Sequence, residues 1–433
     1  MKTDILIVGT GCAGLYCALN IPQDREVLMI SKSDAESSDS FLAQGGICVQ
    51  HDDDDYESFL ADTLKAGHYE NDKESVDIMI RSSRDVIDDL IGYGVDFQKQ
   101  EDGTLLYTKE GAHSHPRILF HEDVTGREIT SKLLARVRER HNVEIVENCT
   151  MLDLLCEGNR CQGIVAKMPD GSLELITADE VVLACGGIGG IYEHSTNYHH
   201  LTGDAVAAAI RHGVEVEHLN YVQIHPTTLY SKNKESRSFL ISESVRGEGA
   251  KLYNARMERF ADELLPRDLL TKAIYKQMEL DGTEYVWEDL RTIPRDELLS
   301  HFPNIIAKCK EEGYDVTKEC IPVVPAQHYF MGGVKVDHEG RTSMEHLYAI
   351  GETACNGVHG RNRLASNSLL ESLVWAKRAA VRMQQDVEQD VQEVDLTEEM
   401  KQRYADIEKL AEENKQLLIK AIEKEEILSN QIH

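Results

Sequence analysis

The first twenty residues combine two hydrophobic patterns. In DILIVGTGCAGLYCALN, residues 4–20, a continuous apolar run gives way after a glycine-rich stretch to apolar residues at helical spacing. A short apolar run followed by a 3.6-residue period predicts a buried β-strand that leads into an α-helix. Gly9, Gly11 and Gly14 lie at the junction, where glycine suits a tight turn and the close approach of a pyrophosphate to the helix N-terminus.

Three later apolar runs have the same strand-like character. They read EVLMISK (26–32), EVVLACGGIGG (180–190), which runs into a glycine-rich turn, and HLYAIGETA (346–354), which ends in Gly351 and Glu352. Continuous apolar runs are typical of strands that are buried on both faces of a sheet. Because the last two runs lie far apart in the sequence, we expect one sheet whose chain is interrupted by an insertion.

Two other segments differ from this pattern. The C-terminal stretch, residues 396–433, has apolar residues at helical spacing and abundant charge, which predicts a short tail of one or two helices. The segment VPAQHYFMGG, residues 324–333, shows neither a helical nor a strand period. We therefore expect His328 to lie on a bend, where the insertion returns to the first domain.

Composition narrows the class of protein. The 433-residue chain is 41% hydrophobic and 28% charged, which is ordinary for a globular protein large enough for one domain plus an insertion. Its formal net charge of -30 argues against a nucleic-acid-binding surface. The N-terminus shows no basic leader and no long apolar span, so we expect a cytoplasmic protein without a membrane partner.

Neither the cysteines nor the acidic run at residues 51–55 indicates a metal site. The ten cysteines are scattered without CxxC spacing, which predicts free thiols in a reducing compartment. The run HDDDD contains four adjacent aspartates, which cannot all face one ion. We expect a solvated acidic turn there and no bound metal.

The end of the second predicted strand distinguishes between two dinucleotide cofactors. An NAD-binding strand usually ends in an acid that hydrogen-bonds the adenosine ribose. Here Ser31 and Lys32 occupy that position, so the NAD fingerprint is broken. The pattern favours a tightly held FAD, with Lys32 near its ribose or phosphate.

A series of longer motifs in a fixed order carries a family resemblance. The motifs are SDSFLAQGGI, TKEGAHSHPRILFHEDVTGREI, NYVQIHPTTLY, SESVRGEGA, LLPRDLLTKAI, VPAQHYFMGGV, LYAIGE and HGRNRLASNSLLES. Over residues 3–385 the chain resembles the succinate dehydrogenase and fumarate reductase flavoprotein superfamily, and most closely its L-aspartate oxidase family. Motifs of this length make chance agreement negligible.

The resemblance implies an α/β fold, in which an FAD-binding Rossmann-like domain is interrupted by an α+β capping domain and followed by a short C-terminal helical tail. We expect the FAD-binding domain at residues 1–220 and 331–390, the capping domain at 221–330 and the tail at 391–433. Many L-aspartate oxidases continue into a longer helical domain, so the short tail is a departure from the family pattern.

The implied cofactor is FAD, and one position predicts how it is held. Respiratory succinate dehydrogenases carry covalent flavin on a histidine where this chain has Asp39, followed by Ser40. We therefore expect non-covalent FAD. By resemblance, its contacts are Gly9, Thr10, Gly11, Cys12, Ala13, Gly14, Lys32, Asp39, Ser40, Phe41, Leu42, Ala43, Gln44, Gly45, Gly46, Asp204, Glu352, Ser368 and Leu369.

The implied reaction is oxidation of L-aspartate to iminoaspartate, with O2 or fumarate as electron acceptor, at the start of de novo NAD biosynthesis. The positions that match the family's substrate site are Glu110, Gln223, His225, Ser242, His328 and Arg363. Among them, His328 and Arg363 match the pair that holds a substrate carboxylate. Arginine suits this role through its bidentate geometry and permanent charge.

The resemblance also implies a path for protons. Arg267 matches the arginine that transfers a proton to substrate in fumarate reduction, and Arg246 and Glu243 match its relay. A relay is needed because a guanidinium alone is a poor base. Which group deprotonates the aspartate ammonium stays open at this point.

Two alternatives share most of these residues. A soluble fumarate reductase would need the same carboxylate contacts, and Glu110 is the residue that favours an ammonium-bearing substrate over it. If Glu110 instead pairs with Lys109 on a surface loop, that distinction is lost. A flavin-bearing redox sensor is the other alternative, although it would need no proton relay. Coupling to a quinolinate synthase, the oligomeric state and the physiological acceptor also stay open.

Overall fold

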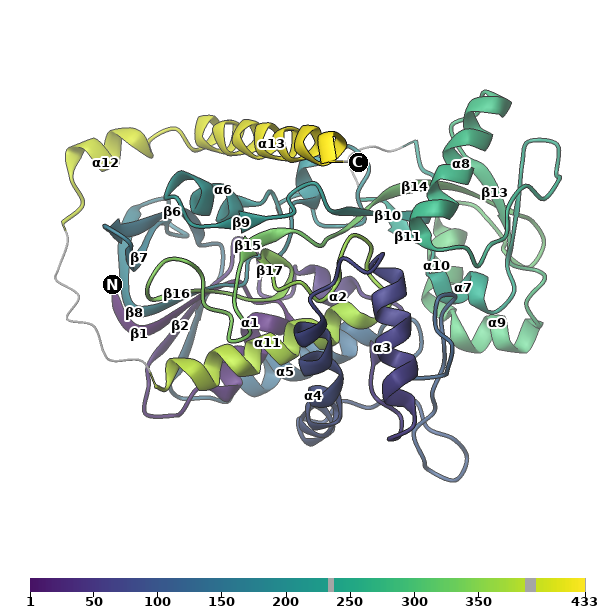
Figure 1. The fold of residues 1–433 in the computed structure, drawn as a ribbon, viewed down its shortest axis with the longest axis horizontal. Coiled ribbons are helices and arrows are strands. Elements are labelled where there is room, and N and C mark those ends of the chain that lie inside the picture. The colour runs from purple at the N-terminus through teal and green to yellow at the C-terminus, as the bar shows by residue number, and fades with distance from the viewer. Residues whose placement is uncertain (233–236, 386–394, 433) are drawn as a thin grey trace.

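The computed structural model describes residues 1–232, 237–385 and 395–432, and these residues form two parts that lie side by side (Figure 1). The larger part contains a seven-stranded sheet between helical layers. The smaller part contains a five-stranded antiparallel sheet with its own helices. The predicted α/β fold with an inserted α+β unit is confirmed.

The seven-stranded sheet joins strands from both ends of the chain, in the order β5-β2-β1-β8-β7-β6, with β16 against β8. Its members are β1 (Lys2–Val8), β2 (Val27–Ile30), β5 (Val143–Val146), β6 (Thr150–Glu157), β7 (Arg160–Lys167), β8 (Leu173–Leu183) and β16 (Leu347–Ala349). The pairing of β16 with β8 is parallel. It confirms the prediction of one sheet interrupted by an insertion.

Alternate residues of β1 enter different hydrophobic cores, which explains why the strand is apolar throughout. Ile5 and Ile7 pack with α1 (Cys12–Asn20), α4 (Lys73–Gly92), α5 (Thr125–Arg138) and α11 (Asn367–Met383). Leu6 and Val8 pack on the other face, with α6 (Asp204–Arg211) and α13 (Ile407–Ile432). Successive side chains of a strand point to opposite faces, so burial of both faces removes any apolar–polar alternation.

The smaller part has its own core and caps one end of the larger part (Figure 1). Its sheet has the order β11-β10-β14-β13-β12. The strands are β10 (Val222–Leu229), β11 (Phe239–Leu240), β12 (Lys251–Tyr253), β13 (Val286–Asp289) and β14 (Ile321–Phe330), and the helices are α7 (Glu243–Gly247), α8 (Arg267–Asp281), α9 (Arg295–His301) and α10 (Pro303–Glu311).

The paired strands β10 and β14 carry the chain into this part and back (Figure 1). His328 lies within β14, so the prediction that it lies on a bend is wrong. Register shifts interrupt the β10–β14 pairing near Gln223 and between His225 and Thr228. Irregular strand pairing can accommodate proline. It also disrupts the alternation of buried and exposed side chains, so the sequence does not show the two-residue period of a strand.

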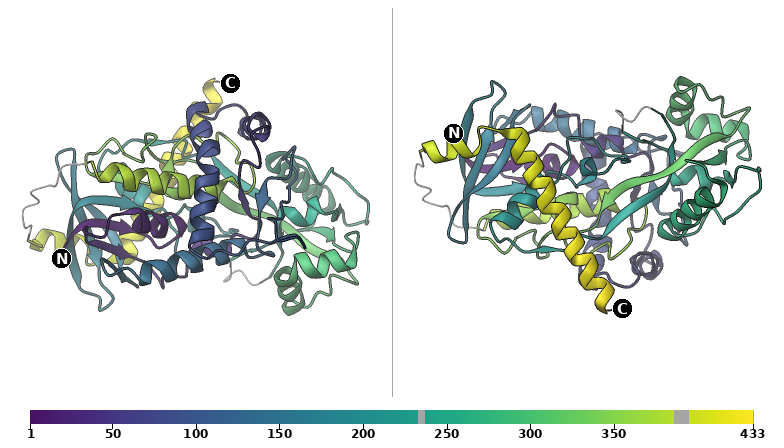
Figure 2. Two further views of the ribbon diagram at one scale, coloured as in Figure 1. Left: turned by 90° about the horizontal axis from the view of Figure 1, so that it is seen from below. Right: turned by 90° about the horizontal axis from the view of Figure 1, so that it is seen from above.

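The remaining elements connect and cover these two parts. They are α2 (Asp39–Leu42), β3 (Ile47–Cys48), α3 (Asp55–Ala66), β4 (Ile118–Leu119), β9 (Val216–Glu217), β15 (Gly333–Lys335), β17 (Ala354–Cys355), α12 (Glu398–Arg403) and two 3-10 turns at Gly189–Ile191 and Gly351–Thr353. In the tail, α12 and α13 agree with the expectation of one or two helices, and α13 crosses over the outer face of the larger part (Figure 2). The expected boundary at residues 390 and 391 lies outside the described residues.

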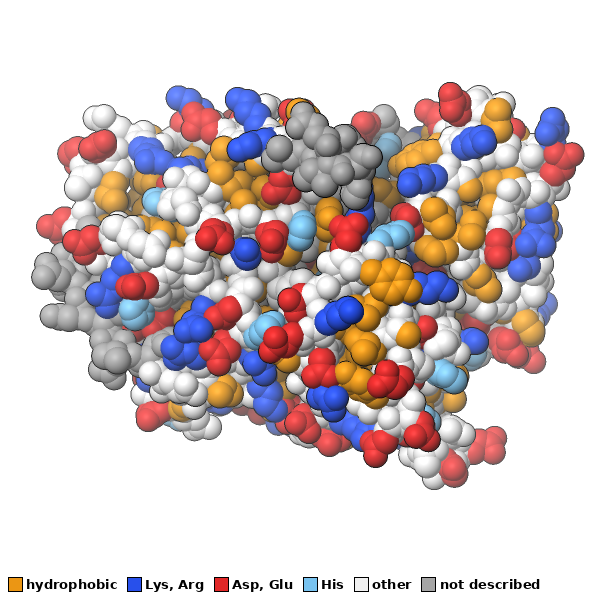
Figure 3. Space-filling view, viewed as in Figure 1, with side chains coloured by type: hydrophobic (Ala, Val, Ile, Leu, Met, Phe, Trp, Pro, Cys, Tyr) orange, Lys and Arg blue, Asp and Glu red, His pale blue; other side chains and the backbone are white. Residues whose placement is uncertain are grey.

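The surface is polar and mixed in charge. Lys and Arg side chains lie among Asp and Glu over the face in Figure 3. Among the described helices, none is long and apolar enough to span a membrane. The acidic run is only partly the solvated turn that we expected, because Asp52, Asp53 and Asp54 are exposed whereas Asp55 is buried against Arg117.

Candidate active site

An extended cleft is lined by residues at the ends of β1, β2 and β8 and by residues of both parts of the molecule. It contains about 1680 Å³ of space, including the open solvent at its mouth. Residues from both parts of the molecule line the cleft, from the β1–α1 turn at one end to Arg267 and Arg363 at the other.

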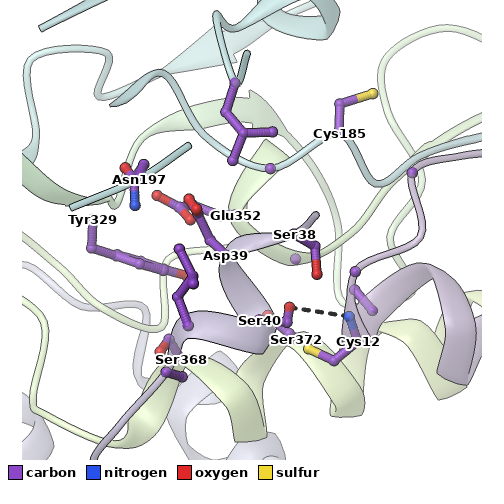
Figure 4. A pocket seen from close by; sticks show the side chains of 18 of the residues that line it. Cys12, Ser38, Asp39, Ser40, Cys185, Asn197, Tyr329, Glu352, Ser368 and Ser372 are labelled. Atoms are coloured by element: carbon purple, nitrogen blue, oxygen red, sulfur yellow. Dashed lines mark hydrogen bonds between the residues drawn. The ribbon is translucent and has the colours of Figure 1, made fainter. Parts of the chain in front are cut away.

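One end of the cleft is formed by the turn between β1 and α1. Gly9 has φ +121°, and a Cβ there would lie 2.0 Å from the carbonyl oxygen of Ala184. A Cβ at Gly14 would lie 2.2 Å from the carbonyl oxygen of Gly9. The N-cap residue of α1, Gly11, has no side chain to cap the helix, and the Cys12 N–H donates to Ser40 Oγ at 3.1 Å (Figure 4). The other N–H groups of this helix N-terminus can bind an anion such as a pyrophosphate.

Lys32 closes the same end of the cleft from the tip of β2. Its Nζ lies 2.6 Å from Asp204 Oδ2, and it also donates to the His200 carbonyl oxygen at 2.9 Å and to Thr202 Oγ1 at 3.0 Å. Asp204 begins α6, and it follows Gly203, whose φ is +74°. The ion pair fixes a cation and an anion where the sequence predicts the ribose end of the cofactor.

Two partly buried carboxyl groups, Asp39 and Glu352, face each other in the middle of the cleft (Figure 4). Asp39 Oδ1 accepts from the Tyr198 N–H at 3.0 Å, and Glu352 Oε1 accepts from the Phe330 N–H at 2.8 Å. Burial raises the pKa of Asp39 to about 7, and burial together with Asp39 raises the pKa of Glu352 to about 8. Carboxyl groups in this state can accept or donate hydrogen bonds to a polyhydroxyl chain.

The cleft fits FAD, because its wall contains buried polar atoms that have no hydrogen-bond partner within the described part of the chain. They are Ser38 Oγ, Asp39 Oδ2, Gln44 Oε1 and Asn197 Oδ1. Buried polar atoms are normally hydrogen-bonded, so these atoms are suited to bind polar groups of a ligand. Asp39 offers no ring nitrogen for flavin attachment. Figure 4 shows its carboxylate pointing into the space beside Tyr329.

Two arginines form the other end of the cleft, and one glutamine holds both. Gln223 Oε1 accepts from Arg267 Nη1 at 2.9 Å and from Arg363 Nε at 3.3 Å. Arg363 also donates to Ser368 Oγ, and its guanidinium lies 4.4 Å from the centre of the Tyr329 ring. Gln223 itself does not line the cleft, contrary to our expectation, and lies beneath the two arginines.

Both arginines have spare hydrogen-bond donors. Among the described residues, none accepts a hydrogen bond from Nη2 of Arg267 or of Arg363. Burial and the neighbouring Arg267 lower the pKa of Arg363 to about 10, so it remains charged at neutral pH. Two buried, partly paired cations that line one cleft are complementary to a dicarboxylate.

A chain of charged groups leads from Arg267 into the smaller part. Arg267 Nε donates to Glu243 Oε2 at 2.6 Å, and Arg246 Nη2 lies 3.9 Å from the same oxygen. Burial would raise the pKa of Glu243, but Arg267 and Arg246 outweigh it, so the pKa is lowered. Burial lowers the pKa of Arg246, which lies behind the cleft wall. Arg267, Glu243 and Arg246 are thus consecutive neighbours.

Two histidines lie between these charges, with ring centres 5.2 Å apart. Burial, together with nearby arginines, holds the pKa of both His225 and His328 well below the usual value, so both rings are neutral at pH 7. His328 Nδ1 lies 2.7 Å from Thr196 Oγ1. His225 Nε2 is buried, and no group of the described residues hydrogen-bonds to it. A ligand atom in the cleft would supply that missing partner.

Glu110 is buried in the cleft wall, so the alternative of a surface pair with Lys109 is wrong. It accepts from Ser366 Oγ at 2.7 Å and from Ser244 Oγ at 3.1 Å. Ser366 adopts φ +63°, a left-handed conformation that is unusual for a serine. Burial, reinforced by the nearby Glu243, raises the pKa of Glu110.

Most of the residues expected from the sequence converge on the cleft. Those that line it are Gly9, Thr10, Gly11, Cys12, Ala13, Lys32, Asp39, Ser40, Leu42, Ala43, Gln44, Gly45, Gly46, Glu110, Asp204, His225, Ser242, Glu243, Arg267, His328, Glu352, Arg363, Ser368 and Leu369. Gly14 and Phe41 do not line it. Five further residues of the cleft could not be predicted from the sequence, because they lie outside strand-end glycine patterns and converge only through tertiary packing. They are Thr196, Asn197, Arg237, Tyr329 and Ser366.

Comparison with known proteins gives a consistent assignment. A family model described as FAD binding domain matches residues 4–369. An L-aspartate oxidase from Clostridium perfringens is 52% identical over 380 residues, which are 88% of this chain and 86% of that protein. An L-aspartate oxidase from Clostridium acetobutylicum is 50% identical over 380 residues, which are 88% of this chain and 87% of that protein.

Solved structures agree at the level of the superfamily. An E. coli quinol fumarate reductase matches with a TM-score of 0.83 and 30% identity, covering 89% of this chain and 70% of that chain. A quinol-fumarate reductase structure with menaquinol molecules matches with a TM-score of 0.85 and 29% identity, covering 96% of this chain and 75% of that chain.

Proposed function

Since this chain belongs to the L-aspartate oxidase family of FAD-dependent oxidoreductases, we propose that Arg363, Arg267 and Glu110 divide the recognition of L-aspartate among them. The enzyme oxidises L-aspartate to iminoaspartate at the start of de novo NAD biosynthesis. The alternative of a soluble fumarate reductase is less favoured, because curated L-aspartate oxidases match most of the chain at 52% and 50% identity.

The cofactor site is the end of the cleft formed by α1, Lys32 and the Asp39–Glu352 pair. FAD, when bound, accepts the hydride from the substrate and passes the electrons to O2 or fumarate. The α1 N-terminus would hold its pyrophosphate, and the partly buried carboxyl groups would hold hydroxyl groups of its ribitol chain. The FAD is proposed to be non-covalent, because Asp39 replaces the histidine that anchors flavin in respiratory relatives.

The substrate carboxylates are proposed to bind the two arginines. Arg267 and Arg363 face the cleft from different parts of the molecule, and Gln223 fixes the distance between them. Their unused Nη2 donors are the single observation that carries this proposal. His225 and His328 add neutral donors or acceptors without changing the charge of the site. A dicarboxylate of four carbons would bridge the two arginines and leave its α-carbon beside the flavin end.

Glu110 is proposed to recognise the α-ammonium group. The carboxylate lies against Gly45, where a Cβ would come within 2.7 Å of Glu110 Oε1. Two serines hold the carboxylate in place. A bound ammonium would offset the burial that raises the pKa of Glu110 and would favour its ionised form. Fumarate and succinate lack this cation and gain nothing from the contact.

Arg267, Glu243 and Arg246 are proposed to move protons between the cleft and the smaller part. Glu243 accepts a hydrogen bond from Arg267 and lies beside Arg246. Both arginines lower the pKa of Glu243 and keep its carboxylate ionised. When Arg267 gives up a proton, Glu243 can therefore pass a replacement proton to it. Arg246 is fully buried and is fixed by Thr227 and by the Glu263 carbonyl oxygen. A buried side chain held in one position is better suited to proton transfer than a side chain in a surface ion pair.

The division into an FAD-binding domain at residues 1–220 and 331–390, a capping domain at 221–330 and a tail at 391–433 is retained as a proposal. Arg267, Glu243 and His225 come from the capping segment, so closure of that segment would complete the site and exclude water. Cytoplasmic location and functional coupling to a quinolinate synthase are likewise proposed from the family reaction, whose product that enzyme would consume.

Anaerobic reduction of the flavin by substrate tests this function directly. L-aspartate added to the oxidised holoenzyme without oxygen should bleach the flavin absorbance within the mixing time or seconds. Succinate at the same concentration should bleach it much more slowly, because it lacks the ammonium that Glu110 binds. Equal bleaching by the two compounds would favour a succinate- or fumarate-metabolising enzyme. No bleaching by either would favour a non-catalytic flavoprotein.

A further inference from the structure

A second group of titratable side chains lies outside the cleft, at the far end of β6. Cys156 on β6 pairs directly with Cys161 on the antiparallel strand β7. The register shifts between Leu155 and Cys156, so the pair lies beside a β-bulge. Cross-strand partners have Cβ atoms about 4.5–5.5 Å apart, and a disulfide needs about 3.5–4.5 Å. A small movement of the bulged strand would therefore allow the two sulfurs to join.

His212 and Asp153 complete this cluster. His212 Nε2 lies 3.0 Å from Asp153 Oδ1, and the imidazole is near enough to Cys156 for each group to shift the pKa of the other. Hydrogen bonds from Cys161 and from His212 lower the pKa of Cys156 to about 6, although burial opposes them. Hydrogen bonds to Asp153 and Cys156 raise the pKa of His212 to about 9. Both shifts favour a thiolate on Cys156 and a charged imidazolium on His212.

Among the described residues, several charged groups reach the cluster through Asp153, and Glu180 acts directly on the Cys161 thiol, whose pKa it raises. Arg211 Nη1 lies 2.7 Å from Asp153 Oδ1, and Tyr404 Oη and Arg403 Nη2 lie 2.9 and 3.4 Å from Oδ2. They come from α6 and from α12 of the tail. They hold Asp153 ionised, and Asp153 keeps His212 charged. From outside the cluster, Met344 Sδ approaches the Cys156 sulfur to 3.5 Å and brings no charge to it.

Cys156 differs from every other cysteine of the chain. The pKa is raised for the other nine thiols, chiefly by burial except at Cys161, where the hydrogen bond to Cys156 has the larger effect. Cys156 is also partly exposed, whereas Cys161 is fully buried. Reactivity of a cysteine follows its thiolate fraction and its access to solvent. Because Cys156 is the more exposed of the pair and its pKa is lowered, we assign it the role of attacking thiol and Cys161 that of its buried partner.

We propose that Cys156 is a peroxide-reactive thiol and that Cys161 converts its oxidised form into a cross-strand disulfide. The Cys156 thiolate attacks one oxygen of hydrogen peroxide, the O–O bond breaks, and hydroxide leaves and takes a proton to become water. The Cys161 sulfur then attacks the sulfenic acid, an S–S bond forms, and the second oxygen leaves as water with the Cys161 proton. Two thiols are oxidised and one peroxide is reduced to two waters.

The site is independent of the cleft, although the enzyme can supply its oxidant. Met151, at the other end of β6, lines the cleft, and five residues of strand place Cys156 about 17 Å further along. Oxidation of L-aspartate with O2 as acceptor releases hydrogen peroxide, so turnover in air would oxidise the pair. The proposal does not rest on that activity, because added hydrogen peroxide serves equally.

The test is a peptide map of the reduced holoenzyme after brief treatment with hydrogen peroxide and alkylation. Trypsin cleaves after Arg160 and separates residues 141–160, which contain Cys149 and Cys156, from residues 161–167, which contain Cys161. We expect a disulfide-linked pair of these peptides in which Cys149 is alkylated. Cys149, whose pKa burial raises to about 11, is an internal control on the same peptide. A map in which Cys156 and Cys161 remain alkylated, or in which Cys149 is linked instead, would overturn the proposal.

Three variants distinguish an effect on thiol reactivity from an effect on protein folding. Cys161→Ser should stop at a sulfenic acid on Cys156 that dimedone labels, and Cys149→Ser, the matched control, should behave as the wild type. His212→Gln should slow the alkylation of Cys156 on the order of tenfold at pH 7 and shift its pH profile upward, because the thiolate loses its cation. Flavin content reports whether each variant is folded. An unchanged alkylation profile in folded His212→Gln would show that the imidazolium does not activate Cys156.

Discussion

Arg117 and Arg363 are both buried, yet one has all its donors occupied and the other does not. Every nitrogen of the Arg117 guanidinium has a partner: Nε and Nη2 bond to Asp55, and Nη1 lies 2.6 Å from Asp62. Burial would lower the pKa of Arg117, but the two carboxylates raise it. Arg363 has only neutral partners and a lowered pKa. A fully paired arginine is typical of a structural centre, and a partly paired one facing a cavity indicates a ligand.

The same distinction separates the regions around these arginines. Arg117 ties the acidic run at 51–55 to the β3–β4 ribbon, and His113 links it to the Ala365 carbonyl oxygen. That network supports the cleft from behind. The cleft itself contains Arg267, Arg363, Glu110 and His225, each buried and each open on one side to the cavity. Substitutions in the two regions should therefore affect different measurements.

The largest effect on stability is expected for Arg117→Leu. Removal of one partner of a buried charge network leaves Asp55 and Asp62 uncompensated and typically costs about 3–5 kcal/mol. Denaturant unfolding of the holoenzyme should report a loss of this size. Molecules that remain folded should bind fumarate normally. A variant with wild-type stability would mean that the paired cluster does not stabilise the fold.

Arg363→Leu should affect catalysis and leave the flavin bound. Removal of a charged bidentate hydrogen bond from a desolvated site costs about 2–5 kcal/mol, so kcat/KM should fall by roughly 30- to 5,000-fold. The loss should be similar for L-aspartate oxidation and for fumarate reduction with an artificial donor, since both substrates carry two carboxylates. Steady-state kinetics with both substrates measure it. Normal efficiency with either substrate would remove Arg363 from the carboxylate site.

Glu110→Gln should separate the two substrates. The substitution keeps the shape of the side chain and removes the charge that we assign to the ammonium, a contact worth about 1.5–3 kcal/mol. L-aspartate oxidation should fall roughly ten- to a hundred-fold in kcat/KM, whereas fumarate reduction should survive or improve. The neighbouring exposed Lys109 provides the matched control, because Lys109→Gln should change neither activity. Equal losses with both substrates would assign Glu110 to the architecture of the site.

The smallest effect should appear in the acid dependence of stability. Burial would raise the pKa of Asp55, but Arg117 outweighs it and the pKa is lowered. A carboxyl group whose pKa is lower in the folded than in the unfolded protein stabilises the fold. This stabilisation is complete above the pKa of the unfolded state, about 3.9 for aspartate. It is lost as the pH falls through the pKa of the folded state. Asp55→Asn should therefore weaken the decline of Tm below pH 4. An identical decline in the variant would show that Asp55 is not linked to acid unfolding.

The sequence predicted the sheet and most of the cleft, for identifiable physical reasons. Apolar runs and strand-end glycines are local signals, so β1, β2, β8, β16 and the turn at Gly9 could be predicted. His328 was assigned to the cleft correctly but to a bend wrongly, because register shifts conceal its strand. The position of Gln223 beneath the arginines could not be predicted, since it depends on how β10 packs against the loop that carries Arg363.

Other features are purely tertiary. Burial of Asp55 requires Arg117, which is 62 residues away in the sequence, and no local pattern distinguishes it from its three exposed neighbours. Arg237 and Tyr329 enter the cleft from the smaller part, and neither follows a glycine turn or a strand end. The pairing of Cys156 with Cys161 depends on a bulge, which shifts the register by one residue. Signals of this kind become visible only in the folded chain.

Binding of fumarate to the oxidised holoenzyme tests the central distinction most directly. Fumarate cannot be turned over without reduced flavin, so perturbation of the flavin absorbance reports its Kd alone. If unpaired donors mark the substrate site, Arg363→Leu should raise the Kd by at least roughly 30-fold, while folded Arg117→Leu keeps the wild-type Kd. A wild-type Kd in Arg363→Leu, or an equal rise in both variants, would contradict the account.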